Sequence, residues 1–419
     1  NDSDETLFTE LNTWEHQAIS TEAYWNGRAP TFRDSETRAA LLVNKQISQH
    51  GLLYSTEYSN HDDFGNPGNI IRGGSSVTDT IETTYNYFID TDLWIINRPQ
   101  NEITVGVGEI TRVYDSKGNL EQQVNYGVET NYTYTTEGDL STETDANQQV
   151  TTYSDYYRGI PRLIVYPENK TITRVVNPTG TVESETSGRG FTTSYDYDVL
   201  DRLILVDYPI HADVTISYTT DNSRLVRTLT RGAYRETTRF SNLMNPVQIE
   251  KTDLTTGITI TTVNEFDILG RQTFTSKPTY GTYPTNLFQS QRDEFGVTTI
   301  LDVLGRELEV RNPDGTQRFT EYHNGGGLPT QPDAGSVRIT DERGNVTVNR
   351  FIGYGSPGDN RLIRIEAPEN MTTTADYDKL RNITRIWQGE NGGSGHERLY
   401  NFDSRFFLIS EDHPEIGHI

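Results

Sequence analysis

Short stretches in which apolar and polar residues alternate run along most of the chain. Examples are "TRVYD" at 111–115, "TTVNEFD" at 261–267 and "VTVNRF" at 346–351. A period of two places successive side chains on opposite faces of a strand, so each stretch predicts a half-buried β-strand. Beyond residue 40 no segment has the 3.6-residue period of a helix, and we expect helix to form less than about 10% of the chain.

A recurring phrase separates these strands. "SYDYDVLDRLILVDYP" at 194–209 returns as "NEFDILGRQTF" at 264–274 and as "TILDVLGRELEV" at 299–310. Its leading residue, usually aromatic, recurs at intervals of about 21 residues, which indicates stacked supersecondary units. The leading residues are Tyr114, Tyr134, Tyr156, Val176, Tyr197, Tyr218, Phe240, Phe266, Leu301, Tyr322, Thr340, Tyr377 and Phe402.

Each place in the phrase has a mechanical role in a predicted hairpin. The second place is often Asp, whose carboxylate can accept hydrogen bonds from main-chain amides two residues on. The fifth place is usually Gly, which favours a turn at positive φ. The aspartates are Asp115, Asp198, Asp267, Asp302, Asp341, Asp378 and Asp403. The glycines are Gly51, Gly65, Gly118, Gly138, Gly180, Gly270, Gly296, Gly305, Gly326 and Gly344.

Some fifth places lack glycine, and three of them bear on the turn geometry. Asp201 and Asn222 stand there in two units, and both residue types tolerate the left-handed region. Arg381 in "YDKLRNI" is harder to accommodate, so a rebuilt turn is the expectation at that point. We further expect the leading aromatics to lie on one face of the sheet, each packed on a neighbour one repeat away.

Composition limits the core and the partners. Only 33% of the residues are hydrophobic and the mean hydropathy is -0.67, so the core must be thin and spread out. The formal net charge of -24 would repel phosphates, which argues against nucleic acid and anionic membranes as partners. Cysteine is absent, which excludes disulfides and thiolate chemistry. No apolar run approaches the roughly 20 residues of a membrane helix, and we expect no membrane insertion.

The phrases resemble the YD repeat of the Rhs family. "FDILGRQ", "LDVLGRE" and "YDSKGNL" are similar to that family's consensus, and "HDDFGNPGNI" and "YFIDTDLWIINRP" (Tyr87–Pro99) resemble segments of bacterial Rhs and Tc-toxin proteins. The resemblance covers roughly residues 41–410. It implies an all-β fold in which an array of YD-repeat antiparallel hairpins forms a curved, spiral sheet, as part of a hollow shell around a toxic C-terminal domain.

Physical reasoning reaches part of this picture from the repeat alone. A dozen or more hairpins give on the order of 25 strands, and open twisted sheets rarely pass about 10 strands without curling. We expect a repeat array at 41–410 and a tail at 411–419. Residues 1–40 form a lead-in that is either irregular or a short helix, since Leu7, Leu11 and Trp14 have helical spacing.

A search for metal sites yields weak candidates. His413 and His418 in "HPEIGH" lack a third ligand, and His61, Asp62 and Asp63 in "HDDFGN" belong to the turn of a repeat. No stretch has the spaced carboxylates of a calcium loop. We therefore predict no metal site and no cofactor.

The search for catalytic groups ends in the same way. Glu183 and Glu185 form a Glu-x-Glu pair of the kind found in ADP-ribosyltransferases, but strand alternation explains the pair as one solvated face. No nucleophile elbow or phosphate loop occurs, and neither does the Asp-Pro-x-Gly-Leu motif of self-cleaving Rhs shells. We predict no catalytic residues and no enzyme activity.

The first hypothesis for function is a structural module of a large bacterial protein, secreted or displayed at the cell surface. Its partners would be the rest of the parent polypeptide, with a C-terminal cargo or toxin domain, and neighbouring repeats. The chain itself is expected to be a piece of that protein. The alternative is an adhesion or carbohydrate-binding repeat protein that contacts glycans or a cell-surface protein. Aromatic candidates for that role are Tyr87, Trp94, Tyr280, Tyr283 and Trp387. An enzyme is the third hypothesis.

Overall fold

The computed structural model describes residues 8–18, 38–49, 52–74, 80–281, 294–323, 335–414 and 417–418. These residues form strands joined by short turns, with two 3-10 segments, η1 (Pro167–Asn169) and η2 (Pro368–Asn370). The first strands are β1 (Phe8–Ala18), β2 (Arg38–Gln49), β3 (Leu52–Ser59), β4 (Asn69–Gly73), β5 (Thr80–Asp90), β6 (Ile95–Thr104), β7 (Gly108–Tyr114), β8 (Leu120–Asn125), β9 (Val128–Tyr134), β10 (Leu140–Thr144), β11 (Val150–Tyr157) and β12 (Ile160–Tyr166).

The middle of the chain continues in the same manner. Its strands are β13 (Lys170–Val176), β14 (Val182–Thr186), β15 (Thr192–Tyr197), β16 (Leu203–Asp207), β17 (Val214–Asp221), β18 (Arg224–Arg231), β19 (Tyr234–Phe240), β20 (Pro246–Asp253), β21 (Thr259–Phe266), β22 (Gln272–Ser276), β23 (Thr279–Tyr280), β24 (Gly296–Leu301) and β25 (Glu307–Arg311). The last are β26 (Gln317–His323), β27 (Gly335–Thr340), β28 (Val346–Gly353), β29 (Asn360–Glu366), β30 (Met371–Tyr377), β31 (Ile383–Glu390), β32 (Gly395–Phe402), β33 (Leu408–His413) and β34 (Gly417–His418).

The chain divides into two compact units. Unit 1 comprises Asn1–Tyr132, Glu321–Ile339 and Asn345–Ile419, and unit 2 comprises Thr133–Thr320 and Thr340–Gly344. Within each unit, strands that follow one another in the sequence pair antiparallel, as β7 does with β8 and β15 with β16. One exception lies in unit 2, where β22 pairs with β24 while the short β23 pairs with β21. The expectation of an all-β array of antiparallel hairpins is confirmed.

A bulge recurs at one place in the repeat. The pairing register shifts just before the leading residue, for example between Glu265 and Phe266 and between Asp376 and Tyr377. The same shift precedes Tyr114, Val176, Tyr197, Phe240, Leu301 and Phe402. A bulge increases the local right-handed twist and bends the strand. The twist of the array is therefore concentrated beside the turns, once in each of these units.

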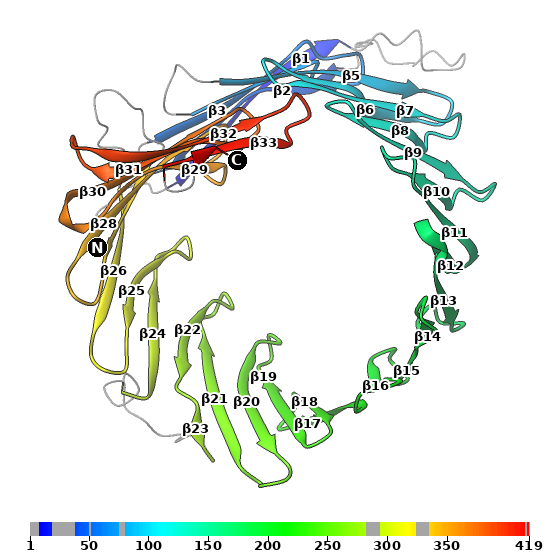
Figure 1. The fold of residues 1–419 in the computed structure, drawn as a ribbon, viewed down its shortest axis with the longest axis vertical. Helices are drawn as coiled ribbons and strands as arrows, with labels where there is room; N and C mark the ends of the chain where they lie inside the picture. The colour runs from blue at the N-terminus through cyan, green and yellow to red at the C-terminus, as the bar shows by residue number, and fades with distance from the viewer. Residues whose placement is uncertain are drawn as a thin grey trace, which may run out of the picture. The chain divides into compact units, whose positions relative to one another are not determined.

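The core is thin, as the composition predicts. In unit 1 the buried Ile47 and Tyr54 pack with Phe351, which brings strand β28 against β2 and β3. Figure 1 shows the orange and red C-terminal strands over the blue N-terminal strands of this unit. In unit 2 the buried apolar residues lie on seven different strands, one to a strand: Ile164, Val176, Val206, Val214, Val226, Phe274 and Val310.

Buried threonines complete the core. Thr83, Thr238, Thr261 and Thr372 are each at most 3% exposed. Three of these hydroxyls have polar partners on neighbouring strands or turns: Thr83 Oγ1 lies 3.2 Å from Thr104 Oγ1, Thr261 Oγ1 donates to the Gly281 oxygen at 2.6 Å, and Thr238 Oγ1 accepts from Arg227 Nη2 at 3.5 Å. Hydrogen-bonded threonine can be buried at little cost, which explains how a chain so poor in aliphatic residues forms a sheet.

The N-terminal lead-in differs from one of the two expectations. Phe8–Ala18 form strand β1, which pairs with β2 from Phe8 opposite Gln49 to Ala18 opposite Arg38. The short helix expected around Leu11 and Trp14 is therefore wrong. Both side chains are exposed, so their helical spacing does not reflect an apolar face buried against the protein.

Candidate functional site

The recurring Asp turns are the most highly organised feature of the described residues. In the turn at 267–271 the Asp267 amide donates to the Arg271 oxygen at 2.9 Å, and the Gly270 amide donates to the Asp267 oxygen at 3.0 Å. The same two hydrogen bonds close the turns that begin at Asp62, Asp115, Asp198, Asp302, Asp378 and Asp403. The repeat phrase thus encodes one turn geometry.

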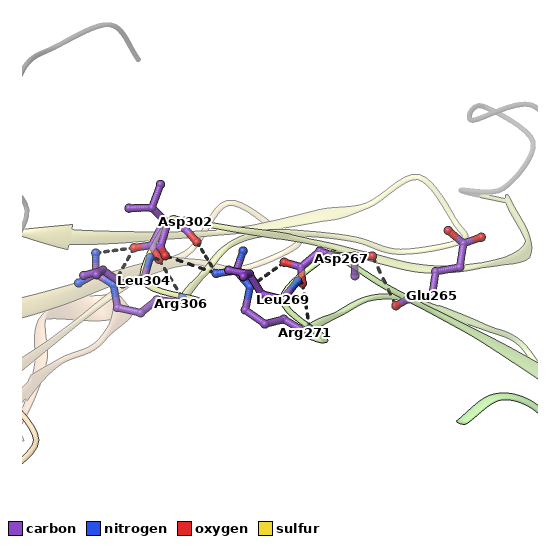
Figure 2. A network of polar contacts seen from close by, with 9 residues as sticks. Glu265, Asp267, Leu269, Arg271, Asp302, Leu304 and Arg306 are labelled. Carbon is purple, nitrogen blue, oxygen red and sulfur yellow. Dashed lines mark hydrogen bonds and ion pairs between the residues drawn. The ribbon is translucent and has the colours of Figure 1, made fainter. Parts of the chain in front are cut away.

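The aspartate side chain holds this geometry from within. Asp267 Oδ1 accepts from the amides of Leu269 and Arg271, both at 2.9 Å, and Oδ2 accepts from Arg271 Nε at 2.6 Å. Asp302 makes the same contacts with Leu304 and Arg306, as Figure 2 shows. Asn replaces Arg in other units, where Asn382 Nδ2 donates to Asp378 Oδ2 at 2.8 Å. The expected Asx-type turn is confirmed, and the sixth place completes it.

The same contacts lower the pKa values of these carboxyl groups. The guanidinium of Arg202, followed by the amides of Arg202 and Leu200, lowers the pKa of Asp198. The Arg271 amide, and after it the Arg271 guanidinium, lowers the pKa of Asp267. Hydrogen bonds from the amides of Phe407 and Arg405 lower the pKa of Asp403. The charged form of each aspartate therefore stabilises its turn.

The fifth place adopts positive φ with or without glycine. Gly118, Gly270 and Gly305 have φ of 79°, 77° and 84°, and Asp201 has 55°. Gly65, Gly138, Gly180 and Gly344 also have positive φ, as predicted. Arg381 keeps the common turn at φ 75°, with Asp378 Oδ1 bound to the amides of Leu380 and Asn382, so the expectation of a rebuilt turn is wrong.

Three assignments within the repeat need correction or fall outside the structure. Asn222 has positive φ (48°) as predicted, but together with Ser223 (64°), in a two-residue hairpin turn. Tyr218 therefore lies in the middle of β17 and leads no Asp turn. Gly296 begins strand β24, where a side chain would meet the Thr275 oxygen at 2.3 Å, so close approach of the main chain explains it. Gly51 and Gly326 lie outside the described residues.

Some turns are tied to their neighbours. Arg271 Nη1 donates to the main-chain oxygens of Asp302 at 3.1 Å and Val303 at 3.5 Å, so the turns at 267–271 and 302–306 lie side by side (Figure 2). In unit 1 the buried Arg361 donates in the same way to the oxygens of Asp378 and Lys379, at 2.8 and 3.4 Å. These contacts join hairpins along the edge of the array.

The leading tyrosines make a further link that the sequence does not predict. Tyr197 Oη donates to the Val182 oxygen at 3.0 Å, and Tyr377 Oη donates to the Leu362 oxygen at 2.8 Å. Tyr87, Tyr114 and Tyr156 reach the oxygens of Pro67, Pro99 and Leu140. Each phenol thus anchors its strand on a preceding one. Any residue can supply a main-chain acceptor, so no residue type marks the partner in the sequence.

The expected aromatic contacts between repeats are found in part. The rings of Phe88 and Tyr114 lie 5.3 Å apart, and the guanidinium of Arg98 lies 5.7 Å from the ring centre of Tyr114. Ring-on-ring contact is thus one of three ways in which leading aromatics are held, beside arginine stacking and the phenol hydrogen bond.

The residues weighed for chemistry have structural surroundings. Glu185 accepts from Arg174 Nε at 2.9 Å across β13 and β14, while Glu183 is exposed on β14. Asp62 Oδ1 accepts from the amides of Phe64 and Asn66, which is the turn role expected for it. His413 pairs with Glu411 at 3.3 Å. Among the described residues no cluster of three or more potential metal ligands occurs.

The aromatic candidates for glycan contact have different surroundings. Tyr87 donates its hydroxyl to Pro67 and is part-buried. Trp387 lies over Gly395, whose added Cβ would meet its ring at 2.5 Å. Trp94 and Tyr280 are exposed, in unit 1 and unit 2 respectively. Tyr283 lies outside the described residues.

Comparison with known proteins yields structural matches only. No family model matches the chain, and neither does any curated protein. A crystal structure of TcdB2-TccC3-TEV matches with a TM-score of 0.43 and 11% identity, over 89% of this chain and 23% of that one. A Photorhabdus luminescens Tc holotoxin pore matches with a TM-score of 0.36 and 12% identity, over 88% of this chain and 24% of that one.

A third match is TcdB2-TccC3 without its hypervariable C-terminal region, with a TM-score of 0.37 and 12% identity over 90% of this chain. The chain spans about a quarter of the length of the chains it matches. No helix in the part of the chain that the structure describes is long and apolar enough to cross a bilayer.

Proposed function

We propose that this chain is a non-enzymatic structural module, part of the wall of a β-shell in a large bacterial protein that is secreted or displayed at the cell surface. The repeat array at 41–410 supplies the wall, and the parent polypeptide supplies a C-terminal effector domain that the shell encloses or presents. The observation that carries the proposal is the turn network at the edge of the array, in which Arg271 binds both its own Asp267 and the next turn at Asp302.

The use of the polar side chains supports a structural role. The carboxylates of Asp198, Asp267 and Asp302 accept main-chain amides and arginine, so the most regularly placed acids of the chain are occupied in holding turns. A catalytic acid needs an accessible proton or lone pair in a site that also binds substrate. In these turns both carboxylate oxygens of each aspartate already accept hydrogen bonds from the turn itself.

Electron cryo-microscopy of the full-length parent protein tests the proposal. We expect a hollow shell of β-hairpins with additional density inside it. A compact, solid β-sandwich would overturn the proposal. Protection of the C-terminal effector domain from protease until the shell is opened would support enclosure, whereas cleavage at the rate of the isolated domain would contradict it.

A second candidate function is an adhesion or carbohydrate-binding repeat. The observation in its favour is the exposure of Trp94 and Tyr280, at 66% and 82%. Exposed aromatic rings suit stacking on sugars. A glycan array discriminates the two functions: binding that is lost in Trp94→Ala or Tyr280→Ala would favour adhesion, and no binding would leave the shell module as the only proposal.

A further inference from the structure

Three Asp turns of unit 2, at 198–202, 267–271 and 302–306, carry aliphatic residues that face solvent. The two residues between Asp and the fifth place are Val199 and Leu200, Ile268 and Leu269, and Val303 and Leu304. In the related turn at 241–245, Leu243 holds the fourth place and Met244 the fifth. Val199 is 100% exposed, Ile268 is 91% exposed and Val303 is 75% exposed. We call these eight residues the tip row.

The turn does not require apolar residues at these places. In the turn at 115–119 the same two positions are Ser116 and Lys117, with the same hydrogen bond from the Lys117 amide to Asp115 Oδ1 at 2.8 Å. Exposed apolar groups that neither the fold nor the turn needs are typical of an interaction surface. Three of the four turns adjoin one another, because Arg271 reaches Asp302 and an added Cβ on Gly270 would meet Asn245 Nδ2 at 3.4 Å.

Within unit 1, Asp turns of this kind make contacts with other parts of the same unit. Its Asp turns contact connections between strands at the opposite edge of its N-terminal hairpins. Lys379 Nζ donates to the Val105 oxygen at 3.0 Å, and the ring of Phe406 lies 4.9 Å from that of Tyr126. The residues at 104–107 and 125–127 lie at the end of β7 and β8 remote from the turn at Asp115. The observed contact is thus the Asp-turn edge against the opposite edge.

Unit 2 has a receptive groove at its own opposite edge. A groove of about 720 Å³ lies between the turns at 231–234 and 253–258 and is lined mainly by apolar atoms. Its lining includes Ala233, Tyr234, Ile258 and Ile260, together with the charged residues Arg231, Lys251 and Asp253. Strand β19 begins at Tyr234 in this groove and ends at Phe240 beside Leu243, so groove and tip row lie at opposite ends of the same strands.

We propose that the tip row of one copy of this chain docks in the groove of a second copy, head to tail. The contact repeats, between copies, the edge-to-edge contact within unit 1. It buries aliphatic tips against Tyr234, Ile258 and Ile260, which are themselves partly exposed. Because the two surfaces differ, the association is heterologous and leaves one free surface of each kind at the ends of the assembly. This proposal does not depend on the proposed function.

Sedimentation velocity over a concentration series tests the association. The tip variant is Ile268→Ser with Leu269→Lys, which copies the natural pair of the turn at Asp115. The groove variant is Ile258→Lys. Val175→Lys serves as the control, since Val175 is equally exposed as Ile258, at 50%, and lies on β13 outside both surfaces.

We expect the wild-type chain and the Val175→Lys control to sediment as larger species as concentration rises. Each docking variant alone should remain monomeric. An equimolar mixture of the two should form dimers and nothing larger, because each variant retains one intact surface. Circular dichroism verifies the fold of each variant, and Val303→Ser with Leu304→Lys provides a second tip variant.

Three results would overturn the proposal. They are a wild-type chain that stays monomeric at every concentration, docking variants that associate like wild type, and a mixture in which no dimer forms. Loss of association in the Val175→Lys control would also count against it, because a general effect of added charge would then explain the variants.

Discussion

Arg271 donates from Nη1 to the main-chain oxygen of Asp302 at 3.1 Å, across 31 residues of sequence. The same guanidinium donates from Nε to Asp267 Oδ2 at 2.6 Å. One side chain therefore closes its own turn and fastens it to the next. The repeat phrase supplies the first contact by its spacing, and the pairing of β22 with β24 supplies the second.

Replacing this arginine should show what the second contact contributes. We expect Arg271→Ala to lower the free energy of unfolding by about 1–2 kcal/mol, because a charge-assisted hydrogen bond between two turns is lost with the ion pair. Arg202→Ala is the comparison, since Arg202 binds Asp198 in its own turn and stacks on the ring of Tyr218 but donates no hydrogen bond to another described turn; its loss should cost less, about 1 kcal/mol. Equal losses in urea denaturation would show that the link to Asp302 contributes nothing.

At the fifth place, replacing glycine should lower the stability of the fold, and introducing glycine should raise it. Gly270→Val should destabilise by about 1–3 kcal/mol, because a β-branched residue is strained at φ 77°. Asp201→Gly should stabilise by about 1 kcal/mol, because φ 55° penalises any residue with a Cβ. Thermal melts of the two variants are the measurement. Unchanged midpoints in both would mean that the turn geometry does not limit stability.

Acid should weaken the turns that these aspartates hold. The lowered pKa values of Asp198, Asp267 and Asp403 mean that their charged forms stabilise the folded chain. That contribution is complete above the ordinary Asp pKa of about 3.9 and is lost as pH falls through the lower folded values. We expect melting temperatures to fall steeply below about pH 4. Asp267→Asn should flatten this decline, and a parallel decline in the variant would contradict the assignment.

Local chemistry explains which parts of the fold the sequence predicts. The Asp turn lies within five consecutive residues. The types and the spacing of Asp267 and Gly270 are therefore enough to predict it from the sequence. Even Arg381 obeys the pattern, although its residue type argues against it: Asp378 and Asn382 hold the turn strongly enough to impose positive φ. The hydrogen bonds of the recurring turn positions thus outweigh the conformational preference of the residue at the fifth place.

Features that depend on contacts with neighbouring strands could not be predicted from the sequence. The bulge before Phe266 and the hydrogen bond from Tyr197 Oη to the Val182 oxygen involve pairing register and a main-chain acceptor, neither of which has a residue signature. The interval of about 21 residues also placed Tyr218 wrongly, because a two-residue turn at Asn222 can replace an Asp turn without changing the count. The helical spacing of Leu11 and Trp14 failed because pairing of β1 with β2 overrides it.

The central claim is that the chain is an array in which each hairpin is held by its neighbours in sequence. Hydrogen exchange on Tyr197→Ala tests it most directly, because this change removes the anchor on Val182 and the packing of one leading ring. We predict faster exchange confined to residues near 176–218, with unchanged protection in distant hairpins. Faster exchange spread evenly over the described strands would mean a single cooperative core, and would contradict the account.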